Sequence, residues 1–126
     1  MKEFEKWFKK AESDLLTIQN NLNSENIPSD VCCFHAQQAV EKYFKGYLVS
    51  RNISFPKTHD LDYLLNLCKQ SNEAFEETRS LIKKLTEYSI TPRYPDMLDD
   101  LTVEDAQQAY QNAGSIKEFI LKHFFE

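Results

Sequence analysis

Residues 29–50 read SDVCCFHAQQAVEKYFKGYLVS, and this stretch decides the fold class. Its apolar and aromatic side chains recur at helical spacing and so share one side of a helix: Ala36, Ala39, Val40, Tyr43, Phe44 and Tyr47. Ser29 or Asp30 can cap the start of this helix. At a rise of about 1.5 Å per residue, the helix would span roughly 30 Å, long enough to cross a small domain.

A second long helix is predicted just before it, over residues 2–22. Its apolar residues recur at alternating steps of four and three, which lines up one face: Phe4, Phe8, Ala11, Leu15, Ile18 and Leu22. A strand would need alternation by two, and this stretch shows none. Because the connection of residues 23–28 is short, we predict that the two long helices pack antiparallel and form the spine of a bundle.

Prolines at positions 28, 56, 92 and 95 divide the remaining chain into further helical segments. Residues 60–70 predict a short helix, and residues 73–88 predict another that must stop before Pro92. Thr102, with Asp105 three residues later, resembles a capping box at the start of a final helix. We therefore predict an all-α fold, a bundle of four to five helices in a single domain over residues 1–126.

Composition narrows the class of protein further. Charged residues make up 28% of the chain, and no apolar run of about eighteen residues or secretory signal is present, so we expect a cytoplasmic protein without membrane contact. The three cysteines lack disulfide spacing and are expected to be reduced and packed. The net charge of −5 counts against a domain that holds a long nucleic-acid backbone, although a local basic patch remains compatible with it.

The predicted helix at residues 29–50 also carries a polar cluster opposite its aromatic stripe. His35, Gln38, Lys42 and Lys45 project within roughly 80° of one another. This cluster can be the solvated face that every amphipathic helix needs. Alternatively, its cations can bind a phosphate or nucleotide through charge-assisted hydrogen bonds. No second Cys/His pair lies near Cys32 and His35, so we expect neither a metal site nor a cofactor.

Two connections hold further candidates. The segment of residues 88–96, YSITPRYPD, combines an arginine, two tyrosines and an aspartate where prolines limit the backbone. It can be a structural turn or part of a binding site. The segment Lys57-Thr58-His59-Asp60 is most simply a helix start, in which Thr58 or Asp60 caps the following helix.

Taken in order, these motifs resemble the prokaryotic HEPN family. They are Trp7 with AESDL at residues 11–15, CFHAQQAVEK at residues 33–42, KTHDL at residues 57–61, and RYPD at residues 93–96, followed by a closing Ala-containing helix. The resemblance covers roughly residues 4 to 122. It implies a helical bundle that commonly dimerises, a nucleotide- or RNA-related role, and pairing with a small nucleotidyltransferase in toxin-antitoxin or related two-component systems.

Ribonuclease members of the HEPN group resemble one another in an arginine followed, after four to six residues, by a histidine. Here that motif is not met, because seven residues separate Arg51 from His59 and Arg93 has no histidine soon after it. RNA cleavage would need a general base and a cation for the developing phosphate charge. We therefore predict a binding or partner module without catalytic residues. The alternative is an unconventional metal-independent ribonuclease that uses Arg51 or Arg93 with His59.

The predicted site joins the polar face of residues 29–50 to the Arg93 loop as one cationic, partly enclosed surface. Its candidate ligand-binding residues are His35, Gln38, Glu41, Lys42, Lys45, His59, Arg93, Tyr94 and Asp96. If Glu41 and Asp96 neutralise the cations internally, the cluster is instead a structural salt-bridge network. We also predict a homodimer, because the last helix carries apolar residues outside its inner stripe, namely Phe119, Leu121 and Phe125.

Overall fold

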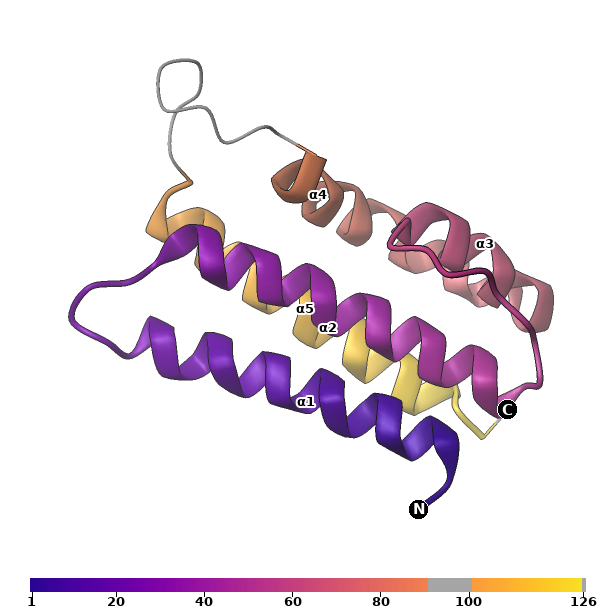
Figure 1. Cartoon of the computed structure of the whole chain (residues 1–126). Coiled ribbons are helices and arrows are strands. Elements are labelled where there is room, and N and C mark those ends of the chain that lie inside the picture. The colour runs from indigo at the N-terminus through magenta and orange to yellow at the C-terminus, as the bar shows by residue number, and fades with distance from the viewer. Residues whose placement is uncertain (91–100, 126) are drawn as a thin grey trace.

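The computed structural model describes residues 1–90 and 101–125, and the described chain is all-α. Its elements in order are α1 (Glu3–Leu22), α2 (Ser29–Ser50), α3 (Leu61–Ser71), the 3-10 helix η1 (Glu73–Thr78), α4 (Arg79–Ile90) and α5 (Val103–His123). No strand occurs within these two ranges. The prediction of a helical bundle with two long antiparallel helices is confirmed, because α1 and α2 run side by side in opposite directions (Figure 1).

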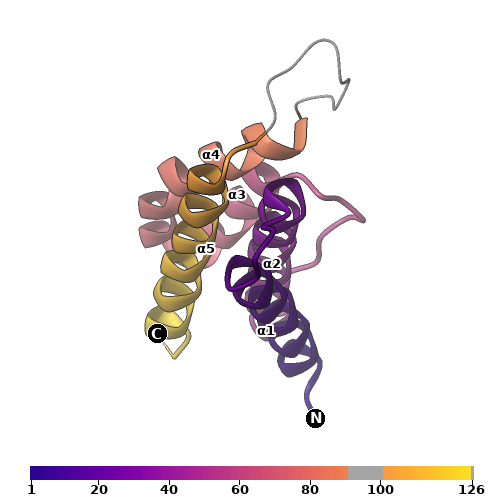
Figure 2. The ribbon, with the colours of Figure 1, turned by 90° about the vertical axis from the view of Figure 1, so that its left-hand side faces the viewer.

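Helix α2 lies at the centre of the bundle rather than at its surface. Helices α1 and α5 pack along it, and α3 and α4 cover a further side (Figures 1 and 2). As a result, polar side chains of α2 are also buried, with Glu41 only 3% and Lys45 only 6% exposed. The interpretation of this polar face as solvated therefore holds only in part: Lys45 is buried, whereas His35, Gln38 and Lys42 are partly exposed.

The helix starts follow local signals in two of three predicted cases. The Thr102 hydroxyl accepts the Asp105 N–H at 3.1 Å, and the Asp105 carboxylate accepts the Thr102 N–H at 2.9 Å, which confirms the capping box. Asp60 caps α3 by accepting the Tyr63 N–H at 3.2 Å. The predicted Ser29 or Asp30 cap is wrong, because α2 already begins at Ser29 and Pro28 holds the capping position without a side-chain hydrogen bond.

The apolar core is rich in aromatic rings. Phe75 packs against Phe44, Tyr47 and Phe119, with its ring centroid 5.1 Å from that of Phe119. Phe119 thus has a partner inside the molecule, whereas Leu121 is 45% and Phe125 93% exposed. All three cysteines are buried, and none of them forms a disulfide. None of the helices in the described part of the chain is long and apolar enough to cross a membrane.

Candidate functional site

A buried carboxylate on α1 organises one half of the polar face of α2. Asp14 Oδ1 lies 2.8 Å from His35 Nδ1, and Asp14 Oδ2 accepts a hydrogen bond from Lys42 Nζ at 2.6 Å. Asp14 is only 7% exposed, while the side chains of His35 and Lys42 are 28% and 22% exposed. The Asp14 carboxylate sets the orientation of the His35 ring through Nδ1, and Nε2 is the other ring nitrogen.

Sequence reasoning assigned no role to Asp14, although a signal was present. The residue falls within the apolar stripe of α1, between Ala11 and Ile18 at steps of three and four. A carboxylate at such a position must find a partner when the helix packs, because an unpaired buried charge is costly. His35 and Lys42, which project toward α1, are those partners.

A second carboxylate organises the other half of this face. Glu41 Oε2 accepts a hydrogen bond from Lys45 Nζ at 3.0 Å, and Glu41 Oε1 lies 2.9 Å from His59 Nδ1. The Lys45 ammonium also lies 5.7 Å from the ring centroid of Trp7 and 5.8 Å from that of Phe55. The segment of residues 51–60 therefore packs over this part of α2, with Phe55 near Lys45 and His59 in contact with Glu41.

The structure thus places six of the nine predicted site residues, and it divides them between two carboxylates. His35 and Lys42 belong to Asp14, and Lys45 and His59 belong to Glu41. Gln38 lies between the two groups on α2. Each lysine is matched by one carboxylate, so this face carries no excess of lysine charge. Arg93, Tyr94 and Asp96 lie outside the described residues.

One exposed stripe of α2, here called the α2 strip, spans an arc of roughly 100° around the helix axis. Val31 is 39% and Phe34 54% exposed, and the Phe34 ring lies edge-on to His35 with centroids 5.5 Å apart. The Gln38 amide is partly exposed and makes no hydrogen bond to the rest of the described chain. The α2 strip consists of Val31, Phe34, His35, Gln38 and Lys42.

The ribonuclease alternative paired Arg51 or Arg93 with His59, and of these the structure describes Arg51 and His59, which contact other residues. The Arg51 guanidinium stacks 4.8 Å from the ring centroid of Tyr47 and donates to the Phe124 carbonyl at the end of α5. His59 contacts Glu41 instead, and no contact joins Arg51 to His59 within the described ranges. Cysteine chemistry has little support, because burial raises the pKa of Cys32 and Cys68 above the ordinary thiol range.

Two further polar networks hold the helices together. Lys117 on α5 and Tyr43 on α2 both contact Glu12 on α1, with Lys117 Nζ at 2.7 Å. Burial alone would raise the Glu12 pKa, but these two hydrogen bonds outweigh it and lower the pKa.

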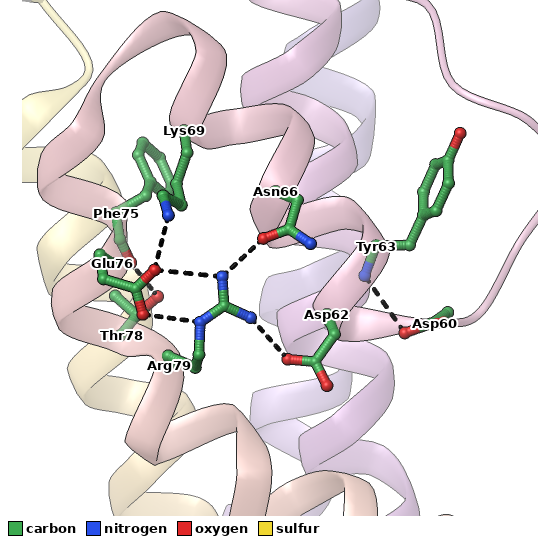
Figure 3. Close-up of polar contacts among 9 residues, drawn as sticks. All are labelled: Asp60, Asp62, Tyr63, Asn66, Lys69, Phe75, Glu76, Thr78 and Arg79. Atoms are coloured by element: carbon green, nitrogen blue, oxygen red, sulfur yellow. Dashed lines mark hydrogen bonds and ion pairs between the residues drawn. The ribbon is translucent and has the colours of Figure 1, made fainter.

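Figure 3 shows the other network, in which Arg79 joins Glu76 and Asp62 at 2.6 and 2.9 Å and also contacts Asn66. Within the described residues, no group of three or more His, Cys, Asp or Glu side chains could hold a metal ion.

Known proteins resemble this chain over nearly all of its length. Residues 4–123 match the family model described as "HEPN domain". "Putative toxin MJ1304" of Methanocaldococcus jannaschii is 27% identical over 134 residues, which covers 95% of this chain and 86% of that protein. The crystal structure of ST0689, an archaeal HEPN homologue, is similar with a TM-score of 0.70 and 25% identity, covering 98% of this chain and 99% of that one.

Proposed function

Since the chain belongs to the HEPN domain family, we propose that it is the toxin-like member of a two-component pair and binds a minimal nucleotidyltransferase through the α2 strip. The name of the relative MJ1304 supports the toxin-like class. Lys42 pairs with Asp14, and Lys45 pairs with Glu41. Because both lysines are already paired inside the molecule, we favour a protein partner over a free nucleotide at this surface. The proposed role is recognition, not catalysis.

A phosphate group at the α2 strip would have to compete with a contact that the fold already makes. Lys42 Nζ lies 2.6 Å from Asp14, a carboxylate that is 7% exposed. Drawing Lys42 away would leave that carboxylate with His35 alone in a poorly solvated position, which is costly. Binding of a free nucleotide here is therefore disfavoured.

A protein partner can use the strip as it stands. Phe34 offers an exposed aromatic anchor, and Val31 extends the apolar area along the same side of α2. Gln38 supplies an amide whose donors and acceptor are unused within the described chain, and a partner side chain can satisfy both. An aromatic centre with polar neighbours is the usual composition of a protein interface.

The test is to co-express the protein with a small nucleotidyltransferase encoded beside it, and to measure complex formation by size exclusion and calorimetry. Phe34→Ala should weaken binding at least tenfold, because aromatic anchors commonly contribute about 2 kcal/mol or more. Tyr63→Ala is the matched control, because Tyr63 is a similarly exposed aromatic residue on α3. An adjacent nucleotidyltransferase that does not bind the wild-type protein would overturn the proposal.

The proposal includes a cytoplasmic homodimer. Three buried cysteines that form no disulfide suit a reducing compartment. Leu121 and Phe125 remain exposed near the end of α5, where Phe125 packs edge-on against Phe124, and a second copy could cover them. Sedimentation should show a dimer that weakens in the double variant Leu121→Ser and Phe125→Ser. A wild-type protein that stays monomeric at high concentration would contradict it.

A further inference from the structure

The pairing of His35 with Asp14 determines which nitrogen of the histidine ring is available for chemistry. A carboxylate only accepts hydrogen bonds, so His35 Nδ1, which lies 2.8 Å from Asp14 Oδ1, is the donor of this contact. In the neutral ring the lone pair then lies on Nε2. Nε2 makes no hydrogen bond within the described residues, and the His35 side chain is 28% exposed. The fold thus presents a nitrogen nucleophile in a fixed tautomer.

Two further side chains on the same side of α2 can meet an anionic group attached to His35. Lys42 shares the Asp14 carboxylate with His35 and is 22% exposed. An ammonium has three N–H donors, so Lys42 can contact a second anion without leaving Asp14. Gln38 lies one turn along α2 from His35, and its amide makes no hydrogen bond within the described chain. A phosphoryl group at His35 would therefore find a cation and an amide donor nearby.

We propose that His35 is a phosphorylation site, which accepts a phosphoryl group on Nε2 from a phosphoramidate or an acyl phosphate. With zwitterionic phosphoramidate, the Nε2 lone pair forms a bond to phosphorus, the P–N bond of the donor breaks, and its electron pair leaves with ammonia. With an acyl phosphate, the P–O bond breaks and the carboxylate leaves. In both cases Nδ1 keeps its proton, and Asp14 balances the positive charge that the ring acquires.

This covalent step differs from reversible binding of a free phosphate at the same surface. A free phosphate would depend on Lys42 for its affinity, and Lys42 is already paired with Asp14. In the phosphorylated protein the new P–N bond holds the group in place, so Lys42 needs only to approach it. The donor also brings its own leaving group, so the acceptor needs little more than a reachable nitrogen.

The second carboxylate group of the molecule provides an internal comparison. His59 Nδ1 lies 2.9 Å from Glu41 Oε1, and its side chain is 75% exposed. The lysine of that group, Lys45, is only 7% exposed and so is not available to a phosphoryl group. If exposure alone decided the reaction, His59 would react first. The arrangement around His35 predicts the opposite order.

The test uses the isolated protein, incubated with phosphoramidate and, separately, with acetyl phosphate. Mass spectrometry should show one added phosphoryl group on His35, and phosphorus NMR should assign it to Nε2. A P–N bond to histidine is cleaved by acid and survives alkali, which distinguishes it from a serine or threonine ester. Reaction with one donor or with both identifies the donor class and supports the site. Because no partner protein is present, failure here would leave the proposed partner contact unaffected.

Variants separate the roles of the side chains. His35→Gln should abolish the modification, whereas the matched control His59→Gln should leave its rate unchanged. Gln38→Ala removes no contact within the described chain and should slow the reaction about threefold. Asp14 acts as a positioning residue, so Asp14→Asn should slow it about tenfold or more. The product of that variant should also be distributed over both ring nitrogens, a change that lost stability alone would not cause.

Three results would each overturn the inference. The first is that neither donor modifies a histidine of the wild-type protein. The second is that His59 is modified in preference to His35. The third is that a folded Asp14→Asn variant reacts at the rate of the wild type and only on Nε2.

Discussion

At the scale of single residues, Gly46 lets α1 and α2 approach closely. A Cβ atom built at this position would lie 2.6 and 2.7 Å from two ring atoms of Phe8 and 3.1 Å from Trp7 Cβ. The Phe8 ring cannot easily move aside, because it packs against the rings of Phe4, Tyr43 and Phe124. The absence of a side chain at residue 46 is therefore a requirement of helix packing.

Gly46→Ala should lower the free energy of unfolding by about 1–3 kcal/mol, because it overpacks this contact. Gly114→Ala is the matched control, since Gly114 lies within α5 and its added Cβ would meet nothing within 4 Å. That change should raise the free energy of unfolding by about 0.5–1 kcal/mol through helix propensity. Urea denaturation of both variants measures the difference, and equal effects would contradict the packing argument.

The buried charge of Lys45 depends on one residue, because its main counter-charge is the Glu41 carboxylate. Glu41→Gln would leave a buried ammonium without a carboxylate, and we expect it to lower the free energy of unfolding by about 3–5 kcal/mol. Glu77→Gln serves as the control, since Glu77 is exposed in η1 and should change stability by no more than about 0.5 kcal/mol. A small effect at Glu41 would contradict the assignment of Glu41 as the main counter-charge of Lys45.

At the scale of helices, local signals predicted most of the elements, and tertiary packing decided which faces they bury. The single helix predicted over residues 73–88 is instead the 3-10 helix η1 followed by α4. The bounds of α1 and α3 lie within one residue of the predicted ranges, and α5 begins directly after the predicted cap at Thr102. The burial of Lys45 could not be predicted from helical spacing, because it depends on the position of Phe55 in the segment that follows α2. The role of Asp14 likewise depends on the register between α1 and α2.

Helix α3 and α4 are joined by an exposed clamp around Arg79 that should respond to acid. Side-chain hydrogen bonds from Arg79 and Lys69 lower the pKa of Glu76 to about 2. The resulting stabilisation is present above the ordinary glutamate pKa of 4.5 and is lost as the pH falls toward about 2. Glu76→Gln should therefore lower Tm at pH 6, with a gap from wild type that closes in acid.

This clamp is exposed, so added salt should also narrow that gap at pH 6. Thermal melts from pH 6 to pH 2, followed by circular dichroism, give the measurement. Glu77→Gln again provides the reference for an unpaired carboxylate in the same 3-10 helix. A gap between Glu76→Gln and wild type that stays constant with pH would contradict the assigned pairing.

At the scale of the whole molecule, α2 is the element on which the others depend. It packs against α1, α3, α4 and α5 (Figure 2), so its hydrogen bonds cannot open while the bundle stays assembled. Amides of residues 39–48 should therefore show the slowest hydrogen exchange, with rates governed by global unfolding. Amides of η1 should exchange faster through local opening. Slower exchange in α3 than in α2 would contradict this order.

Because Lys45 is buried, its chemical labelling reports a local opening of the structure around it. An amine-reactive reagent can acetylate exposed lysines such as Lys9 directly, but we expect it to reach the Lys45 ammonium only after the covering rings of Trp7 and Phe55 move apart. The labelling rate at Lys45, read by mass spectrometry, therefore reports how often the packing of α1 and residues 51–60 over Lys45 opens.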